Sequence, residues 1–453
     1  MRTDPFRKDP PVFDSRPAPR GLAVPSSRIS RLARFGGLAS GVAGGVALNG
    51  ARELARGRRP SLGALILTPA NITRLTDELS RMRGAAMKVG QLMSMDTGDV
   101  LPPELSDILA RLRAEAHPMP PRQLKAVLNA AWGEGWLKRF ERFDATPIAA
   151  ASIGQVHRGW TRDGRDMAIK VQYPGVRRSI DSDVDNVAAL VRMSGLLPKG
   201  LDVSPMLAEA KRQLHEEADY RREGAQLARF GALLADAADY AVPALHADFT
   251  TDSVLAMGFV PGAPVERMVD APQAERDRIG ALLFALLFRE LFDFRLMQTD
   301  PNFANYRWDK GTGRLVLLDF GAARAVPEAL AENYRALLRA GVRDDRETMR
   351  ETALAIGFFA PDTDARHQAQ VLDMMGLAFA PLRRGGPFDF GDDAMPARMR
   401  DAAMAMAEER DFVHVPPMDA LFLQRKIAGV YLLASRLRAR VDVAGLLAPW
   451  IDA

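Results

Sequence analysis

The stretch Met297–Trp308, MQTDPNFANYRW, places an acid and an amide, Asp300 and Asn305, five residues apart. A second acid, Asp319, ends the apolar run VLLD, and the DKGTG segment before that run predicts the turn of a hairpin. Carboxylate and amide oxygens are the ligands that Mg²⁺ prefers, so we predict that Asn305 and Asp319 bind this metal. Asp300 lies where a hydroxyl or a water would be deprotonated or positioned, which makes it a predicted catalytic residue together with Lys170 and Glu223.

The segments upstream complete the order of elements that a nucleotide site of the protein-kinase type requires. Residues 149–157, AAASIGQVH, precede a predicted strand and take the place of a loop that covers phosphates. Residues 168–170, AIK, end the next predicted strand with Lys170, and Asp163-Gly164 between the two strands predicts a hairpin. We therefore predict an ATP site. Its predicted nucleotide-binding residues are Ala149, Ala150, Ala151, Ser152, Lys170 and Met257, the last of which precedes the FVPGAP hinge.

Acidic residues follow on a predicted helix that runs from about Ser204 to Leu234. In protein kinases a helix carboxylate orients the lysine toward the α and β phosphates. On one continuous helix, at 100° per residue, Asp219 and Glu223 share a face, whereas Glu217 lies well round from both. We therefore predict that Glu223 pairs with Lys170. If the helix is distorted here, Glu217 could take this role instead.

Four features differ from an ordinary protein kinase. Gln298 and Thr299 stand where His and Arg are usual, and Asn302 stands where a lysine would contact the transferred phosphoryl group. Three alanines, 149–151, replace the glycines of a phosphate loop, and each Cβ limits how closely the backbone can wrap phosphates. A helix is predicted to begin at Pro327, soon after the DFG triplet. This leaves almost no activation segment on which a protein substrate could dock.

The composition limits the other classes of function. The 453 residues are 47% hydrophobic and 26% charged, as in ordinary globular proteins. The net charge is only +4 and is spread over many arginines, so we expect no nucleic-acid partner. The absence of cysteine excludes disulfides, thiolate zinc sites and cysteine nucleophiles, and the six histidines show no ligand spacing. A second DFG triplet, at Asp389, follows no apolar strand and is predicted to be a turn.

The N-terminal region is predicted to contain a tail, a glycine-rich segment and a helix. Residues 1–34 are rich in Pro, Arg and Ser and predict a flexible tail. Residues 35–51 carry no charge and repeat Gly every four residues, which favours either a linker or a helix in contact with a membrane or with a second copy of the chain. A helix is predicted from Thr68, and by spacing alone Lys88 and Gln91 lie on its polar, solvated face.

Five of these motifs resemble signatures of the UbiB family of atypical kinase-like proteins, specifically its branch that supports coenzyme Q. They are KVGQ, AAASIGQVH, EADYRRE, MQTDPNFAN and LLDFGA, in the family's order, and the similarity extends from about residue 30 to the C-terminus. The resemblance implies that a helical region carrying the Lys-x-Gly-Gln motif packs over the active site. Lys88 and Gln91 would then face the site as regulatory residues. Glu217 and Asp219, which match the family's Glu-x-Asp motif, would meet Lys88 or the metal.

The predicted fold class is α+β, a kinase-like bilobal fold with a small N-lobe that contains β-strands, a helical C-lobe and an added helical region. The predicted boundaries are 1–34 for the tail, 35–67 for the glycine-rich segment, 68–145 for the Lys-x-Gly-Gln extension, 146–260 for the N-lobe and 261–453 for the C-lobe.

The resemblance implies an ATP- and Mg²⁺-dependent ATPase that supports ubiquinone biosynthesis. Its partners would be ubiquinone-precursor lipids or the biosynthetic enzymes, at the inner membrane face, with the protein cytoplasmic and peripherally attached. Two alternatives remain open at this point. One is a small-molecule or protein kinase, and the other is a nucleotide-gated, lipid-binding scaffold that does not hydrolyse ATP.

Overall fold

The computed structural model describes residue 85, residues 119–193 and 204–391, residues 395, 397–399, 401, 402 and 414, and residues 416–452.

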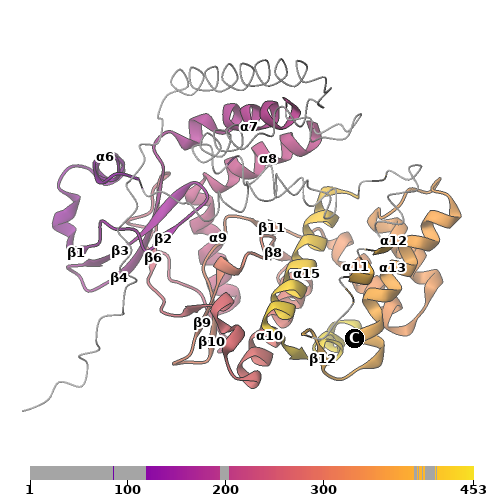
Figure 1. Cartoon of the computed structure of the whole chain (residues 1–453). Coiled ribbons are helices and arrows are strands. Elements are labelled where there is room, and N and C mark those ends of the chain that lie inside the picture. Colours follow the sequence, from indigo (N-terminus) through magenta and orange to yellow (C-terminus); the bar gives the residue numbers. More distant parts are fainter. Residues whose placement is uncertain are drawn as a thin grey trace, which may run out of the picture.

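One lobe is built on a five-stranded sheet in the order β1-β3-β4-β6, with β2 paired to the N-terminal part of β3 (Figure 1). Its strands are β1 (Phe140–Phe143), β2 (Ala149–Ala150), β3 (Gly154–Thr161), β4 (Asp166–Gln172) and β6 (Val254–Gly258). The predicted hairpin is confirmed, since β3 and β4 pair antiparallel around a turn in which Gly164 has a φ of 88°.

The alternation of side chains along β4 decides which face of the sheet carries Lys170. Met167, Ile169 and Val171 are fully buried on one face, where they pack with apolar residues of α6 (Pro121–Trp132). Successive side chains of a strand point to opposite faces, so Lys170 points the other way. The hydrophobic residues that fix the sheet therefore also aim the lysine.

Three helices follow β4, and one sequence prediction is wrong here. The helices are α7 (Val176–Met193), α8 (Ser204–Glu217) and α9 (Tyr220–Leu233). The predicted single helix from about 204 to 234 is interrupted between Glu217 and Tyr220. Asp219 has non-helical backbone angles and its carboxylate accepts a hydrogen bond from the Arg222 N–H at 3.0 Å. An aspartate at this position satisfies a free donor of the new helix, which favours a fresh start over continuation.

The second lobe is mostly helical and surrounds a small four-stranded sheet. The sheet has the order β5-β10-β9-β7, and a separate pair joins β8 to β11. The strands are β5 (Tyr240–Ala241), β7 (Ala263–Pro264), β8 (Leu296–Gln298), β9 (Tyr306–Asp309), β10 (Arg314–Leu317) and β11 (Ala323–Ala325). The helices are α10 (Gln273–Phe288), α11 (Glu328–Arg343), α12 (Arg346–Ile356), α13 (Ala365–Arg384), α15 (Met418–Leu437) and α16 (Val443–Ile451), and β12 (Phe388–Asp389) pairs with β13 (Arg440–Val441).

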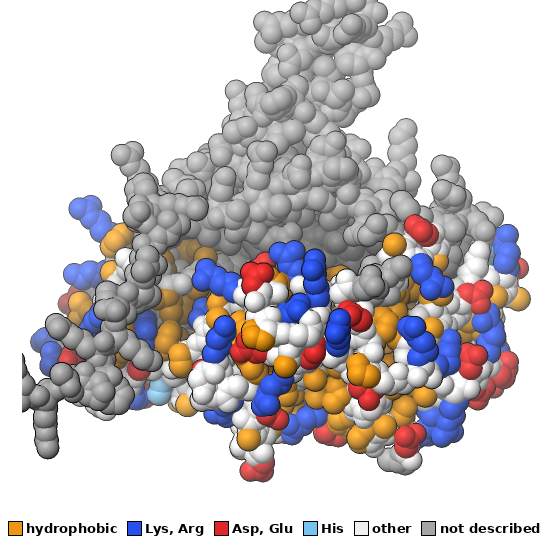
Figure 2. Space-filling model, turned by 60° about the horizontal axis from the view of Figure 1, so that its bottom comes forward, with side chains coloured by type: hydrophobic (Ala, Val, Ile, Leu, Met, Phe, Trp, Pro, Cys, Tyr) orange, Lys and Arg blue, Asp and Glu red, His pale blue; other side chains and the backbone are white. Residues whose placement is uncertain are grey.

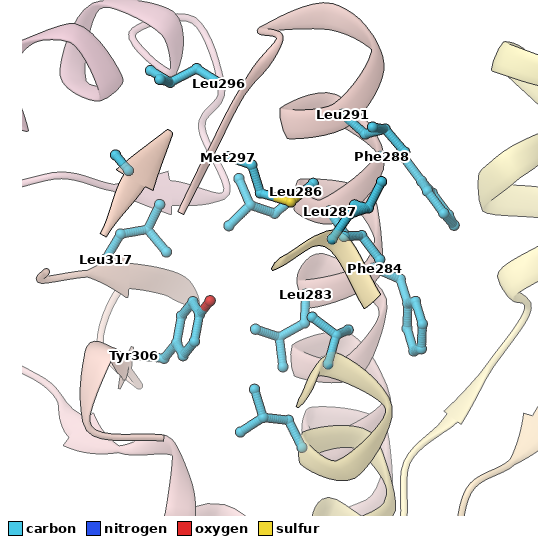
Figure 3. Packing of buried hydrophobic residues seen from close by; sticks show 14 of the residues in the cluster. Leu283, Phe284, Leu286, Leu287, Phe288, Leu291, Leu296, Met297, Tyr306 and Leu317 are labelled. Atoms are coloured by element: carbon cyan, nitrogen blue, oxygen red, sulfur yellow. The ribbon is translucent and has the colours of Figure 1, made fainter. Parts of the chain in front are cut away.

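Helix α10 lies in the core of this lobe and supports the MQTDPNFAN segment. Its buried residues include Leu283, Leu286 and Leu287, which belong to the same core cluster as Met297 and Tyr306 at the two ends of that segment. Figure 3 shows the phenylalanines of α10 on the side away from Tyr306. The buried residues of α10 all lie toward its C-terminal end, from Ile279 to Phe288. The backbone that carries Asp300 and Asn305 is thus packed against a rigid element.

The GQVH part of the predicted phosphate loop has a structural role on β3. The Met119 N–H donates to Gln155 Oε1 at 2.8 Å, Gln155 Nε2 lies 2.8 Å from His157 Nε2, and His157 Nδ1 lies 2.9 Å from the Asp144 carbonyl oxygen. Since a carbonyl can only accept, Nδ1 carries the proton and Nε2 accepts from the glutamine amide. A neutral histidine therefore links the segment before α6 to the sheet.

This neutral histidine predicts a specific pH dependence of stability. Burial lowers the pKa of His157 below its ordinary value, so the unfolded chain binds the proton more readily than the folded chain. The contribution of His157 to stability is therefore present above pH ~6.5 and is lost as the pH falls toward the lowered pKa. In urea unfolding followed by tryptophan fluorescence, wild type should lose more stability on acidification than His157→Gln. Parallel pH profiles for the two proteins would refute this assignment.

Candidate active site

Lys170 is the centre of a buried ion cluster between the two lobes. Its Nζ lies 2.8 and 3.1 Å from the two carboxylate oxygens of Glu223 and 3.2 Å from Asp319 Oδ2. The Glu223 side chain is 2% exposed and the Asp319 side chain 36% exposed, so one acid is enclosed and the other faces outward. The predicted pair of Glu223 with Lys170 is confirmed. The interruption of the helix does not bring Glu217 into this role.

The charges of this cluster do not balance. Burial alone would lower the pKa of Lys170, but Asp319 and Glu223 hold it well above its usual value, so the lysine stays charged. Burial raises the pKa of Glu223 to about 7, opposed by Lys170 and reinforced by Asp319. One ammonium thus faces two carboxylates. A cation bound at the partly exposed carboxylate of Asp319 would relieve their repulsion.

The hairpin of β9 and β10 brings Asn305 close to the segment that carries Asp319. Tyr306 pairs with Leu317 in this hairpin, so the residues just outside the pair, Asn305 and Leu318, are also neighbours. The Leu318 N–H donates to the Asn305 carbonyl oxygen at 3.0 Å, which extends the ladder by one residue. The DKGTG turn predicted from sequence therefore sets the register that places both predicted metal ligands at one edge.

Asp300 is fixed by three neighbours. Its N–H donates to Gln298 Oε1 at 2.7 Å, so the glutamine that replaces the usual histidine shapes the turn. Asn305 Nδ2 donates to the Asp300 carbonyl oxygen at 2.9 Å. Arg425 of α15 places Nη2 2.7 Å from Asp300 Oδ1. Sequence analysis missed Arg425, because nothing near it in the chain indicates a partner 125 residues away.

The alanine loop is a narrow strand and turn. β2 pairs Ala149 with Val156 and Ala150 with Gln155, and the Ala151 N–H closes the turn by donating to the Gly154 carbonyl oxygen at 2.9 Å. The methyl groups of Ala149 and Ala150 lie on the exposed surface. The loop is therefore closed by its own backbone hydrogen bonds.

Ser152, Glu217 and Met257 have clear positions. Ser152 Oγ donates to Glu217 Oε2 at 3.0 Å, so the loop is fastened to the end of α8. Met257 is buried in β6, in the core cluster that also includes Ile153 and Tyr220. Two of the residues predicted to bind nucleotide therefore have structural contacts: Ser152 contacts Glu217, and Met257 belongs to the same core cluster as Ile153.

Two predictions about the regulatory residues have different outcomes. Asp219 is the N-cap of α9 and accepts the Arg222 N–H, a role that the sequence did not predict, while its expected contact with the metal or with Lys88 stays a prediction. An aspartate used as a cap has a structural purpose that a continuous-helix model could not show. Lys88 and Gln91, and the segment 35–51, lie outside the described residues.

A second ion pair lies beneath the Asp300 turn and is fully enclosed. Lys426 Nζ of α15 lies 2.8 Å from Glu290 Oε2, and both side chains are 1% exposed. The same Nζ donates to the Tyr306 hydroxyl at 3.2 Å. Glu290 belongs to a π-helical segment, Arg289–Asp293, that extends α10. Of two neighbouring residues of α15, Arg425 therefore contacts Asp300, and Lys426 contacts Glu290 and the Tyr306 hydroxyl.

The residues present fit a Mg²⁺-nucleotide. Within the described residues no three His, Cys, Asp or Glu side chains form a metal cage. The oxygen donors available are the half-exposed carboxylate of Asp319 and the amide of Asn305. Mg²⁺ is usually held by one or two protein oxygens together with substrate phosphates and water. The donor set is of that kind, and Lys170 lies on the side from which phosphates would be contacted.

The fold and the site together define a kinase-like protein. A sheet lobe that carries the lysine and its glutamate partner faces a helical lobe that carries Asp300, Asn305 and Asp319, which is the arrangement of protein kinases. The model of the ABC1 atypical kinase-like domain matches residues 111–353. The chain belongs to this family of atypical kinases, and the expected kinase-like α+β fold and the UbiB-type resemblance are confirmed.

The chain is similar to eukaryotic atypical kinases in sequence and to a bacterial protein in structure. The Saccharomyces cerevisiae protein "Atypical kinase COQ8, mitochondrial" is 39% identical over 430 residues, which cover 94% of this chain and 85% of the yeast protein. Rat "Atypical kinase COQ8B, mitochondrial" is 38% identical over 425 residues, with 93% and 80% covered. The solved structure of Mycobacterium tuberculosis Rv3197 with erythromycin has a TM-score of 0.60 and 26% identity, covering 84% of this chain and 95% of that one.

None of the helices in the described residues combines the length and the apolar character needed to cross a membrane.

Proposed function

We propose that the protein binds ATP with Mg²⁺ and hydrolyses it, and that this activity supports ubiquinone biosynthesis. The observation that carries the proposal is the cluster in which Lys170 contacts both Glu223 and Asp319. This is the contact pattern of a kinase lobe pair in its nucleotide-binding arrangement. The names of the yeast and rat relatives, which are atypical kinases of the COQ8 group, support the link to coenzyme Q.

The mechanism follows from the positions of the chain's own residues. Lys170, held by Glu223, would contact the α and β phosphates, and Asn305 with Asp319 would hold the metal. When bound, Mg²⁺ neutralises phosphate charge and orients the terminal phosphate. Asp300 would orient the attacking water through the carboxylate oxygen that does not contact Arg425. Arg425 holds that carboxylate, and Gln298 holds the Asp300 backbone N–H, so the position of Asp300 does not depend on bound substrate.

The segment after Asp319 favours hydrolysis over transfer to a protein. β11 pairs with β8 immediately after the DFG triplet, and α11 begins at Glu328. A protein substrate normally docks on the longer activation segment found at this place. Asn302 caps a short helical turn through the Ala304 N–H and supplies no cation for phosphoryl transfer. A kinase activity toward a small molecule remains the second candidate, because the Asp300, Asn305 and Asp319 set is complete.

Membrane attachment and lipid partners are part of this proposal, and the named yeast and rat relatives are mitochondrial proteins. We propose that the protein acts peripherally, on the inner membrane face, and that ubiquinone-precursor lipids or the enzymes that handle them are its partners. A second copy of the chain could bind through 35–51. Among the described residues on the face drawn in Figure 2, acidic and basic side chains are interspersed with hydrophobic ones and form no continuous basic surface for nucleic acid.

The proposal predicts ATP hydrolysis without a phosphorylated product. Purified protein with Mg²⁺-ATP should release phosphate, and liposomes that contain a phenolic quinone precursor should increase the rate, since the substrate class is a membrane lipid. The measurement is phosphate release, with radiolabelled γ-phosphate to detect any phosphorylated lipid or protein. A labelled acceptor would favour the kinase alternative. Tight ATP binding with no phosphate release would favour the scaffold.

A further inference from the structure

Two consecutive residues of α9 hold the metal-binding segment from different sides. Glu223 contacts Lys170, which contacts Asp319 Oδ2. Arg222 reaches past this cluster to the backbone that follows Asp319. Its Nη1 donates to the Gly321 carbonyl oxygen and its Nη2 to the Ala323 carbonyl oxygen, each at 2.7 Å. A guanidinium with its two nitrogens on two carbonyls fixes both the distance and the direction of the segment.

The start of α9 explains why these two side chains reach the same place. Asp219 caps the helix by accepting the backbone N–H of Arg222 itself, so the first turn is anchored at this residue. Successive helical residues are about 100° apart, and residues 222 and 223 therefore share one half of the helix surface. The cap sets where that half points. Asp219 thus acts on the site through the two residues that it orients.

The segment after Asp319 is tied back to the Asp319 carboxylate. The Gly321 N–H donates to Asp319 Oδ1 at 2.9 Å, while the Gly321 carbonyl oxygen accepts from Arg222. A Cβ added at Gly321 would lie 3.5 Å from Glu223 Oε2, which shows how closely the loop approaches α9. Hydrogen bonds therefore run from Arg222 through Gly321 to Asp319 and on through Lys170 to Glu223. The side chain of Asp319 is held at both oxygens.

A further ion pair fastens the same segment to α8. Arg324 Nη2 lies 2.8 Å from Glu216 Oε2, and this oxygen is 3.9 Å from Arg222. Arg212 of α8 also pairs with Glu216, at 2.7 Å. The acid of α8 is thus shared by arginines from three elements. These side-chain contacts hold residues 321–324 against α8 and α9.

We propose that Arg222 is a positioning residue that holds Asp319 in its metal-binding orientation, in place of an ordered, phosphorylated activation segment. The inference rests on the proposed function, because it concerns the Mg²⁺ site of the nucleotide. Arg222 touches neither metal nor phosphate. It acts through Gly321, whose N–H sets the direction of the Asp319 carboxylate.

The test uses Arg222→Met in the full chain and two measurements. Hydrogen exchange without nucleotide should show faster exchange of the Gly321 and Ala323 amides than in wild type. Calorimetric ATP binding at increasing Mg²⁺ should require a roughly tenfold higher Mg²⁺ concentration for half-saturation, since two charge-assisted hydrogen bonds are lost. Arg222→Lys keeps the positive charge but cannot donate to both carbonyls in the same geometry. It should therefore give a smaller increase in the Mg²⁺ concentration needed for half-saturation.

Arg221 provides the matched control, because it is the preceding residue of the same helix and pairs with Asp252 on the exposed surface. Arg221→Met should leave both measurements unchanged. Unchanged Mg²⁺ dependence and unchanged exchange in both Arg222 variants would overturn the inference, even if the melting temperature falls. A wild-type chain that does not bind Mg²⁺-ATP would overturn the proposed function and the inference with it, so the two failures are distinguishable.

Discussion

Asp319→Asn is expected to abolish the thermal stabilisation of the protein by Mg²⁺-ATP. A ligand at 100 times its dissociation constant stabilises the folded state by about 2.7 kcal/mol, and this whole increment depends on binding. Asp319 is the anionic ligand of the predicted metal pair, and its carboxylate is the more exposed of the two acids around Lys170. The neutral amide would remove the charge that attracts the metal. The measurement is the melting temperature with and without Mg²⁺-ATP.

The free protein should tolerate this change. Asp319 raises the pKa of the enclosed Glu223, so removing its charge reduces the repulsion between carboxylates around one ammonium. We therefore expect the melting temperature without ligand to stay close to that of wild type. Asp389→Asn is the control, because Asp389 begins the same triplet but lies at the end of β12, where it accepts from the Gly391 N–H and from Arg440. A full ligand-induced shift in Asp319→Asn would exclude Asp319 as the metal ligand.

Lys426→Met is expected to destabilise the protein by about 3 to 5 kcal/mol, the usual cost of removing one partner from a buried ion pair. The Glu290 carboxylate, 1% exposed, would lose the ammonium at 2.8 Å and keep only a distant backbone donor. Burial already raises the pKa of Glu290, and the loss of Lys426 would raise this pKa further because Lys426 favours the charged carboxylate. The measurement is the free energy of unfolding in urea.

The double variant separates the pair from the packing of the lysine stem. Glu290→Leu in the Lys426→Met background removes the stranded charge, and replacing a buried pair by apolar groups is often neutral or stabilising, so most of the loss should be recovered. Arg440→Met removes an exposed pair with Asp389 and should change the unfolding free energy by less than ~0.5 kcal/mol. A loss below about 1 kcal/mol in Lys426→Met alone would contradict the burial of this pair.

The local patterns of the sequence determined the elements that carry the chemistry. Alternation along β4 fixed the direction of Lys170, since the buried Ile169 and Val171 lie on the other face. The DKGTG turn fixed the register of β9 and β10, and with it the approach of Asn305 to the Asp319 segment. These results depend on neighbours in the chain, for which periodicity and turn chemistry are sufficient signals.

The break before α9 shows where such local reasoning fails. An N-cap residue and a residue inside a helix can have the same neighbours in the sequence. The sequence around Asp219 is therefore compatible with one continuous helix and with a cap between two helices. In the folded protein Asp219 is the cap, so Glu217 ends α8 and Glu223 lies in α9. The prediction for Glu223 was right although the continuous helix on which it rested was wrong. Both geometries allow this glutamate to reach Lys170.

The partners that complete the site were decided only by the tertiary structure. Arg425 contacts Asp300, Lys426 contacts Glu290 and Arg222 contacts Gly321 over separations of about a hundred residues or more. The chain contains 61 Lys and Arg residues, and an arginine on a helix can pair with any acid or carbonyl that packing brings within reach. The sequence by itself therefore predicted which residues carry the chemistry. The folded chain determined which cations hold them, because that choice depends on distances between elements and not on patterns within them.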